Sequence, residues 1–226
     1  MSLPNSPCLP SRRLQPFIDM ITTCKKCGNH NWDKLIKDGK VICPKCGYSW
    51  DHIKLPLFIL SGCSGLGKTT TAIEIMQRKV DFVILDGDIL GGVQNAVTTE
   101  DYRRRVDTIQ ALSRNINQSG RPVLWTVAGN LDMFPDSYNT RFFDGIYCLA
   151  LVSDEKTVRE HMTVGRGITD EGWIEGSVGY NEYLRTHDSI GAQKYEILDI
   201  TQKTPSQVAD EVISWVNKYL NKNTVG

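Results

Sequence analysis

The chain has 226 residues, of which 40% are hydrophobic and 23% charged, as in an ordinary globular protein. Its length suits one α/β domain with a small additional module, and the lack of an apolar run of about 18 residues excludes an integral membrane protein with helical spans. The 26 basic and 26 acidic side chains cancel. The overall charge therefore does not indicate a nucleic-acid-binding protein.

The first 20 residues predict a flexible leader. Four prolines interrupt residues 1–20, and no continuous apolar run follows a basic start, so this stretch does not resemble a secretory signal. We therefore expect a cytoplasmic protein without a membrane partner.

Four cysteines form two closely spaced pairs, Cys24 with Cys27 and Cys43 with Cys46. Fifteen residues separate the pairs, and this spacing is typical of a four-cysteine zinc site. A tight turn lets both sulfurs of a pair reach one tetrahedral ion, and Gly28 and Gly47 follow the pairs, where such a turn needs a positive φ. The pattern predicts a zinc ribbon over residues 21–54.

The alternative for these cysteines is a pair of disulfides or a dithiol redox site. A cytoplasmic setting disfavours disulfides, and no βαβ unit of the thioredoxin type surrounds the pairs. Four thiolates leave no open coordination position, so the zinc would be structural and would supply much of the folding free energy of a module of about 30 residues. Between the pairs, Asp38 and Gly39 favour a tight hairpin turn.

The ribbon also carries aromatic side chains, namely Trp32, Tyr48 and Trp50, among several lysines. Aromatic and basic side chains in this combination can bind single-stranded nucleic acid. The alternative is that the aromatic rings form the small core of the ribbon or pack it on the rest of the chain. The second interpretation is favoured, and nucleic-acid binding stays open.

A predicted strand at residues 57–60 leads into a match to the phosphate-loop pattern G-x-x-x-x-G-K-[ST], and a helical stretch follows. Glycines let successive backbone N–H groups point at phosphate oxygens at a helix N-terminus. We expect Lys68 to contact the β- and γ-phosphates of a nucleoside triphosphate and the Thr69 hydroxyl to ligate Mg²⁺. Cys63 is interpreted as a small loop residue, with a redox role as the alternative. The expected nucleotide-binding residues are Gly62, Cys63, Ser64, Gly65, Leu66, Gly67, Lys68, Thr69 and Thr70.

Two carboxylates, Asp86 and Asp88, follow the next predicted strand at residues 81–85. Ligands of open α/β sheets bind at the carboxyl ends of the strands. One carboxylate there can orient magnesium or its water, while the other accepts a proton from an acceptor hydroxyl. A plain Asp-Gly turn is the alternative.

The phosphate loop, the strand end LDGD and the downstream layout resemble the small P-loop kinases, a group that includes shikimate, gluconate, adenylylsulfate and nucleoside or nucleotide kinases. The resemblance covers about Pro56 to Leu220, within an expected domain of residues 55–226. It implies an α/β fold with a five-stranded parallel sheet flanked by helices, a mobile lid, bound ATP with Mg²⁺, and Asp86 and Asp88 as the acceptor and magnesium carboxylates.

A loop with glycines on either side of Arg166 resembles the lid of these kinases, which we expect at about residues 163–185. There Arg166, together with Arg159, would stabilise the transferring phosphoryl group and exclude water. A solvated loop arginine is the alternative. The loop after the fifth predicted strand, from Asp199 to Lys203, would line the adenine pocket by the same resemblance.

These observations predict an ATP-dependent phosphotransferase whose acceptor is a nucleoside or a nucleotide, with Lys68, Asp86, Asp88 and Arg166 as catalytic residues. Two alternatives stay open. One is a nucleic-acid-binding NTP-dependent protein, including a kinase that acts on a polynucleotide end and uses the ribbon. The other is a nucleotide-sensing regulator with little turnover.

Overall fold

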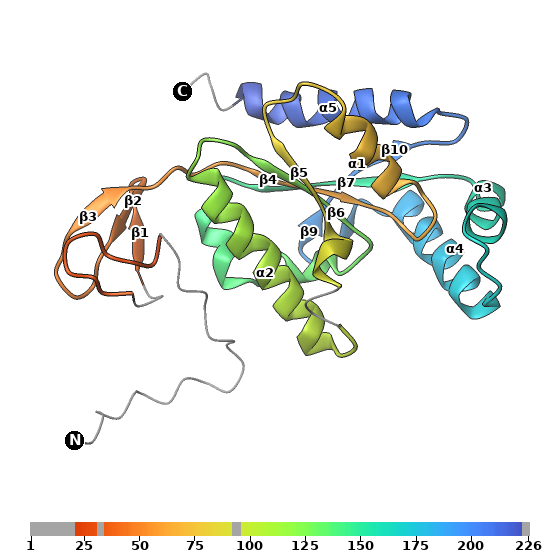
Figure 1. The fold of residues 1–226 in the computed structure, drawn as a ribbon. Helices are drawn as coiled ribbons and strands as arrows, with labels where there is room; N and C mark the ends of the chain where they lie inside the picture. The colour runs from red at the N-terminus through yellow and green to blue at the C-terminus, as the bar shows by residue number, and fades with distance from the viewer. Residues whose placement is uncertain (1–20, 31–33, 92–95, 223–226) are drawn as a thin grey trace. The chain divides into compact units, whose positions relative to one another are not determined.

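The computed structural model describes residues 21–30, 34–91 and 96–222. The chain forms two compact units that divide between His52 and Ile53 (Figure 1). Across the described ranges, no helix is long and apolar enough to cross a membrane.

The smaller unit contains an antiparallel three-stranded sheet, β1(Leu35–Lys37), β2(Lys40–Ile42) and β3(Ser49–Asp51), in the order β1-β2-β3. The hairpin predicted at Asp38 and Gly39 is confirmed, and both residues have positive φ, 49° and 67°. Strand β3 was not predicted. Its Trp50 is buried and stacks on Tyr48 with ring centroids 6.0 Å apart, which supports a packing role for these rings. Trp32 lies outside the described residues.

The larger unit is built on five parallel strands in the order β10-β7-β4-β6-β5. The order places β4 at the centre, directly before the phosphate loop. The predicted five-stranded parallel sheet is confirmed. The strands are β4(Leu57–Ser61), β5(Val83–Asp86), β6(Val123–Val127), β7(Ile146–Val152) and β10(Glu196–Asp199).

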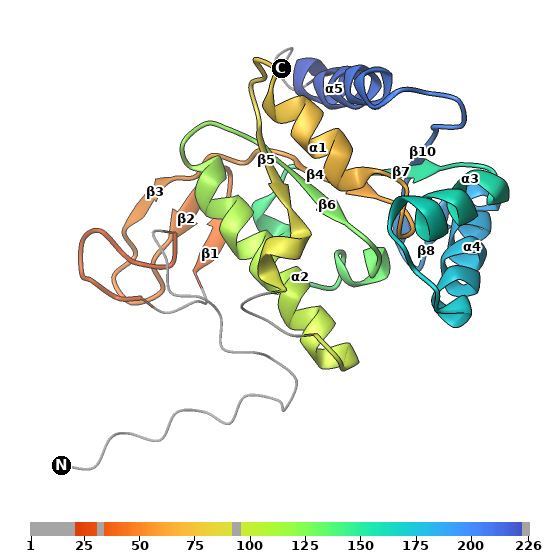
Figure 2. The same cartoon turned by 45° about the vertical axis from the view of Figure 1, so that its right-hand side comes forward.

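Helices cover both faces of this sheet: α1 and α5 lie on one face and α2 on the other (Figure 1). Helices α3 and α4 lie together at the end of the sheet where β4 leads into α1 (Figure 2). The helices are α1(Lys68–Met76), α2(Thr99–Asn117), α3(Glu155–Glu160), α4(Glu171–Thr186) and α5(Pro205–Lys222). Shorter elements are the 3₁₀ helices η1(Gly87–Leu90), η2(Leu131–Met133) and η3(Tyr138–Phe142), the π-helix η4(His161–Gly165), and the strands β8(Ser189–Ile190) and β9(Gln193–Lys194), which form a hairpin.

The first four residues of β4 are all apolar because both faces of the strand are buried, as in other parallel sheets. Phe58 and Leu60 belong to the core that includes α1 and α5, whereas Leu57 and Ile59 belong to the core that includes α2. Alternation along a strand sends successive side chains to opposite faces. The strand that supports the phosphate loop is thus packed on both sides.

Helices α1 and α5 are also joined by polar contacts. Arg78, just after α1, donates to the backbone oxygen and hydroxyl of Ser206 at 3.0 and 2.8 Å, and it pairs with Asp210. A capping box starts α5, since the Thr204 backbone N–H donates to Gln207 Oε1 at 2.9 Å and the Gln207 N–H donates to Thr204 Oγ1 at 3.3 Å.

Candidate active site

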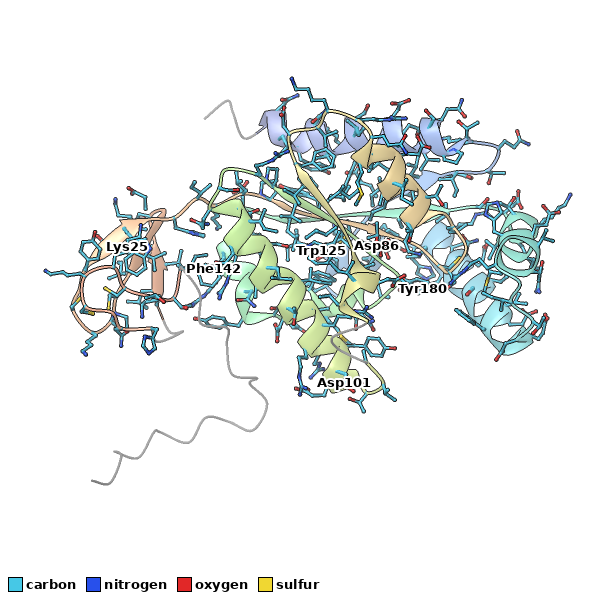
Figure 3. The ribbon with its side chains drawn as sticks, in the orientation of Figure 1. Lys25, Asp86, Asp101, Trp125, Phe142 and Tyr180 are labelled. Atoms are coloured by element: carbon cyan, nitrogen blue, oxygen red, sulfur yellow. The ribbon has the colours of Figure 1, made fainter. Side chains whose placement is uncertain are left out.

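The parallel register brings the ends of β4, β5 and β6 to one edge of the sheet, where Ser61 pairs with Val127 and Asp86 with Thr126. A cleft of about 1040 Å³ opens at this edge. Figure 3 shows Asp86 there, at the end of β5. The cleft is lined by the phosphate loop and the start of α1, by η1, by α2, by the residues that follow β6, by the lid, and by the loop that enters α5.

Two glycines show why the phosphate loop needs its sequence pattern. Gly62 has a φ of 148°, and a Cβ at this position would lie 2.8 Å from the Leu151 backbone oxygen. Gly67 has a φ of 71° and precedes the first residue of α1. Both positions exclude most side chains, so the glycines let the loop turn tightly and start the helix with its free N–H groups facing the cleft.

Lys68 lies across the loop that it follows. Its ammonium donates to the backbone oxygens of Gly62 and Cys63, each at 2.8 Å. Burial lowers the pKa of Lys68, an effect that the nearby carboxylates of Asp88 and Asp86 oppose. The lysine and both carboxylates of the predicted site therefore interact within one cleft.

Cys63 is buried, and burial raises the pKa of its thiol to about 11. A thiol needs a lowered pKa and access to solvent to react. The structure therefore favours the interpretation of Cys63 as a small loop residue over the redox alternative.

Asp86 and Asp88 have different environments. Asp86 Oδ1 accepts a hydrogen bond from the Asp88 backbone N–H at 2.9 Å, whereas Asp86 Oδ2 is buried and has no partner among the described residues. Asp88 is exposed and lines the cleft. Gly87 is required between them, because a Cβ there would lie 2.5 Å from the Thr126 backbone oxygen. Residues 86–88 thus form a tight turn, in which Asp86 Oδ2 and the Asp88 carboxylate remain available to a ligand.

These oxygens fit a magnesium ion. A buried carboxylate oxygen without a partner is costly unless a cation or donor meets it. The Asp86 Oδ2 atom meets this description, and Thr69, in the first turn of α1, lines the same cleft. Oxygen donors of this kind are what Mg²⁺ prefers.

Three consecutive arginines lie on α2. The structure separates them, because Arg105 lines the cleft and donates from Nη2 to the Gly87 backbone oxygen at 2.8 Å, whereas Arg103 and Arg104 are exposed. Tyr102 also lines the cleft. Arg105 supports the turn that carries both carboxylates and places a fixed positive charge beside them.

The predicted lid arginine, Arg166, lines the cleft, with its guanidinium carbon 5.5 Å from the centre of the Trp173 ring. The preceding segment is a π-helix, an element that often occurs at functional sites. It places His161 Nδ1 3.0 Å from the Gly65 backbone oxygen. Contacts with the phosphate loop thus begin at His161, two residues before the segment expected to form the lid.

Arg159 has a different role from the one suggested by its position beside the lid. Its guanidinium pairs with Glu155, Glu171 and Glu175 at 2.7, 3.2 and 2.5 Å. Arg159 is not among the described residues that line the cleft. The hydrogen bonds to Glu175 and Glu155 raise the pKa of Arg159, and the cluster joins α3 to α4.

Replacing Arg159 by Met is expected to increase amide hydrogen exchange at residues 155–175, because three like charges would then face one another without a cation. Hydrogen exchange followed by mass spectrometry measures this. Lys156→Met is the matched control, since Lys156 is on the same helix and forms only a 3.8 Å pair with Glu160. Equal protection of the segment in both variants would contradict a joining role for Arg159.

The opposite part of the cleft is formed by the loop after β10 and the start of α5, where Ile200, Lys203, Pro205 and Val208 line it. Ile200 and Lys203 belong to the range expected to line the adenine pocket, Asp199 to Lys203, so two residues of that range line the cleft. Pro205 and Val208 were not predicted, because the start of a surface helix gives no sign in the sequence that it faces a ligand.

The four cysteines of the smaller unit form a second site. Their sulfurs all lie within 4.8 Å of one another, with Cys24 and Cys46 3.7 Å apart and Cys27 and Cys43 3.8 Å apart. Sulfurs placed about 2.3 Å from one tetrahedral ion are about 3.8 Å apart. The donor set therefore fits a structural zinc ion, and these separations are too long for disulfides.

No protein-family model matches the chain, and no curated protein is similar to it in sequence. Solved structures do share its fold. A sugar kinase from Janibacter sp. HTCC2649 matches with a TM-score of 0.55 and 14% identity over 73% of this chain and 95% of that chain. A gluconokinase from Sinorhizobium meliloti 1021 matches with a TM-score of 0.54 and 15% identity over 75% and 96%.

The APS kinase of Mycobacterium tuberculosis, solved with AMPPNP and APS, matches with a TM-score of 0.51 and 14% identity over 73% of this chain and 99% of that chain. The chain has the fold of the small P-loop kinases. These matches confirm, at the level of the fold, the resemblance that was based on the phosphate loop and the LDGD strand end. The four-cysteine cluster is compatible with the predicted zinc ribbon.

Proposed function

We propose that this chain is an ATP-dependent phosphotransferase that acts on a small acceptor. The observation that carries the proposal is that one cleft holds the phosphate loop, the Asp86 and Asp88 carboxylates and Arg166. An enzyme of phosphoryl transfer needs little covalent chemistry from the protein, and its task is to position the reactants and stabilise charge. The fold neighbours, described as sugar, gluconate and APS kinases, support the same class of reaction.

Each residue has a role in this proposal. Lys68 binds the β- and γ-phosphate oxygens, and the Thr69 hydroxyl with Asp86 Oδ2 would hold a magnesium ion, which neutralises phosphate charge when bound. This assignment exchanges the two carboxylate roles that the resemblance implied, because the buried oxygen without a partner among the described residues belongs to Asp86, whereas Asp88 is exposed in the cleft. The acceptor oxygen attacks the γ-phosphorus, its proton passes to Asp88, and ADP leaves. Arg166 stabilises the negative charge of the transferred group.

The proposed acceptor is a nucleoside or a nucleotide. Tyr102 offers an aromatic ring and Arg105 a cation on the side of the cleft next to Asp86 and Asp88. An aromatic face suits a base, and a guanidinium suits a phosphate oxygen. The proposed ribbon is an accessory module in this function, since Trp50 is buried instead of free to stack on a nucleic-acid base.

Release of ADP from Mg²⁺-ATP, measured against a panel of nucleosides, nucleotides, sugars, sugar acids and polynucleotide ends, tests the proposal. We expect one small acceptor to stimulate release, and we expect Asp88→Asn to reduce the stimulated rate by about 100-fold or more, the usual contribution of a general base. Asp81→Asn, at an exposed carboxylate before β5, is the matched control.

The outcomes separate the candidate functions. Stimulation that survives in Asp88→Asn would contradict the role of Asp88 as proton acceptor. Stimulation by polynucleotide ends alone would favour a kinase that acts on nucleic acid. ATP binding without stimulation by any member of the panel would contradict the kinase proposal and favour a nucleotide sensor.

A further inference from the structure

Trp173, in the first turn of α4, contacts the phosphate loop from the lid. Its indole Nε1–H donates to Ser64 Oγ at 3.3 Å, and its side chain lines the cleft while the residue is 48% exposed. The residue is held in place by the helix cap, because its backbone N–H donates to Asp170 Oδ1 at 2.9 Å. The cap thus anchors the backbone at Trp173, while the indole donor lies at the loop and is open to a ligand.

Other contacts place the same part of the lid on the first half of the loop. His161 Nδ1 lies 3.0 Å from the Gly65 backbone oxygen. A Cβ on Gly65 would lie 3.0 Å from Met162 Cγ, so the glycine lets the π-helix approach the loop closely. The lid therefore rests on Ser64 and Gly65 by two side-chain hydrogen bonds and one close packing contact.

The position of Lys68 shows which phosphate these residues would meet. The lysine of this motif reaches the β- and γ-phosphates, and here its ammonium lies 2.8 Å from the backbone oxygens of Gly62 and Cys63. Ser64 directly follows Cys63. The remaining loop leads to the helix N-terminus, and the backbone N–H groups of such a loop bind the α- and β-phosphates. Ser64, and with it the indole N–H of Trp173, therefore lies at the γ-phosphate end.

The indole N–H of Trp173 would form a stronger hydrogen bond with a phosphate oxygen than with Ser64 Oγ. An indole N–H can only donate, and its partner Ser64 Oγ is a neutral hydroxyl at 3.3 Å. A phosphate oxygen carries negative charge, and hydrogen bonds to charged acceptors are shorter and stronger. The ring also holds the Arg166 guanidinium at 5.5 Å, so a movement of Trp173 toward a phosphate would carry the arginine with it.

We propose that Trp173 recognises the γ-phosphate of bound ATP through its indole N–H and thereby distinguishes ATP from ADP. On binding of ATP, the N–H leaves Ser64 Oγ and donates to a γ-phosphate oxygen, and Arg166 follows the ring. ADP lacks the group that Trp173 recognises. This inference rests on the proposed nucleotide-binding function and adds a specificity residue to it.

The test is to measure the dissociation constants of Mg²⁺-AMPPNP and Mg²⁺-ADP by isothermal titration calorimetry. Trp173→Phe keeps an aromatic ring for Arg166 and removes the indole N–H together with the five-membered ring that carries it, and we expect it to weaken AMPPNP binding about tenfold, which corresponds to about 1.4 kcal/mol. Binding of ADP is expected to stay the same. Tyr183→Phe is the matched control, because it removes a donor from an exposed ring on the same helix, where the hydroxyl donates to the Ser189 backbone oxygen at 3.1 Å.

Selective loss of AMPPNP affinity in Trp173→Phe would support the proposal. Unchanged affinity for both nucleotides, or equal weakening of both, would overturn it and leave the kinase proposal intact. Wild-type protein that binds neither nucleotide would overturn both proposals. Because Trp173 is half exposed, we expect the variant to fold, and its melting temperature measures this.

Discussion

Replacing Lys68 by Met is expected to reduce the rate of phosphoryl transfer by about 1,000-fold, the scale of losing a preorganised positive group at the transferring phosphate. The same change is expected not to lower the melting temperature. Burial lowers the pKa of Lys68, which means that the folded chain disfavours the charged form of this side chain. Removing the charge therefore removes a desolvation cost, which offsets the loss of two hydrogen bonds to loop carbonyls.

Acceptor-dependent ADP release and differential scanning calorimetry measure the two effects. Lys79→Met is the matched control, since it makes the same substitution at an exposed lysine just after α1. Near-wild-type turnover in Lys68→Met would contradict the phosphate-binding role. A large fall in melting temperature would show instead that the lysine holds the loop together.

Removing zinc is expected to unfold the smaller unit and to leave the P-loop domain folded. Structural zinc contributes about 10–16 kcal/mol of apparent binding free energy in small zinc modules, and a three-stranded sheet of this size has little core of its own. Zinc content measured by mass spectrometry should be one ion per chain, and it should be lost in Cys43→Ser. Limited proteolysis should then cleave within residues 21–52 before it attacks the larger unit.

Cys8→Ser is the control, because it removes a cysteine and leaves the four-cysteine motif intact. If Cys43→Ser retained one zinc ion and the protease resistance of the wild type, the four-sulfur site would be wrong. Cleavage of both units at the same rate would show that the larger unit needs the ribbon to stay folded.

The phosphate loop was predictable from the sequence because its chemistry is local. Every residue from Gly62 to Thr69 is contiguous, and the flanking apolar strand and helix are needed for the loop to work. The same holds for the paired cysteines and for the turn at Asp38 and Gly39. In each case a few neighbouring residues determine the backbone geometry.

The rest of the site depends on contacts between distant segments. Three consecutive arginines on a helix point in different directions, so only the packing of α2 shows that Arg105 faces the cleft. The spacing of apolar residues on α4 does not show that Trp173 is half exposed and donates a hydrogen bond to Ser64, more than 100 residues earlier in the chain. The sequence alone does not distinguish Arg159 from Arg166. In the structure, Arg159 pairs with three glutamates, whereas Arg166 lines the cleft.

The polar link between α1 and α5 also has a mechanical consequence. Arg78 fixes the far end of the phosphate-binding helix to Ser206 and Asp210, and the near end continues from a strand that is packed on both faces. We expect these contacts to oppose sliding of the helix along its axis when a triphosphate binds. We therefore expect the half of the cleft formed by the loop and α1 to stay rigid, and adjustment to a nucleotide to fall to the segment expected to form the lid, which contacts the loop through the side chains of His161, Met162 and Trp173.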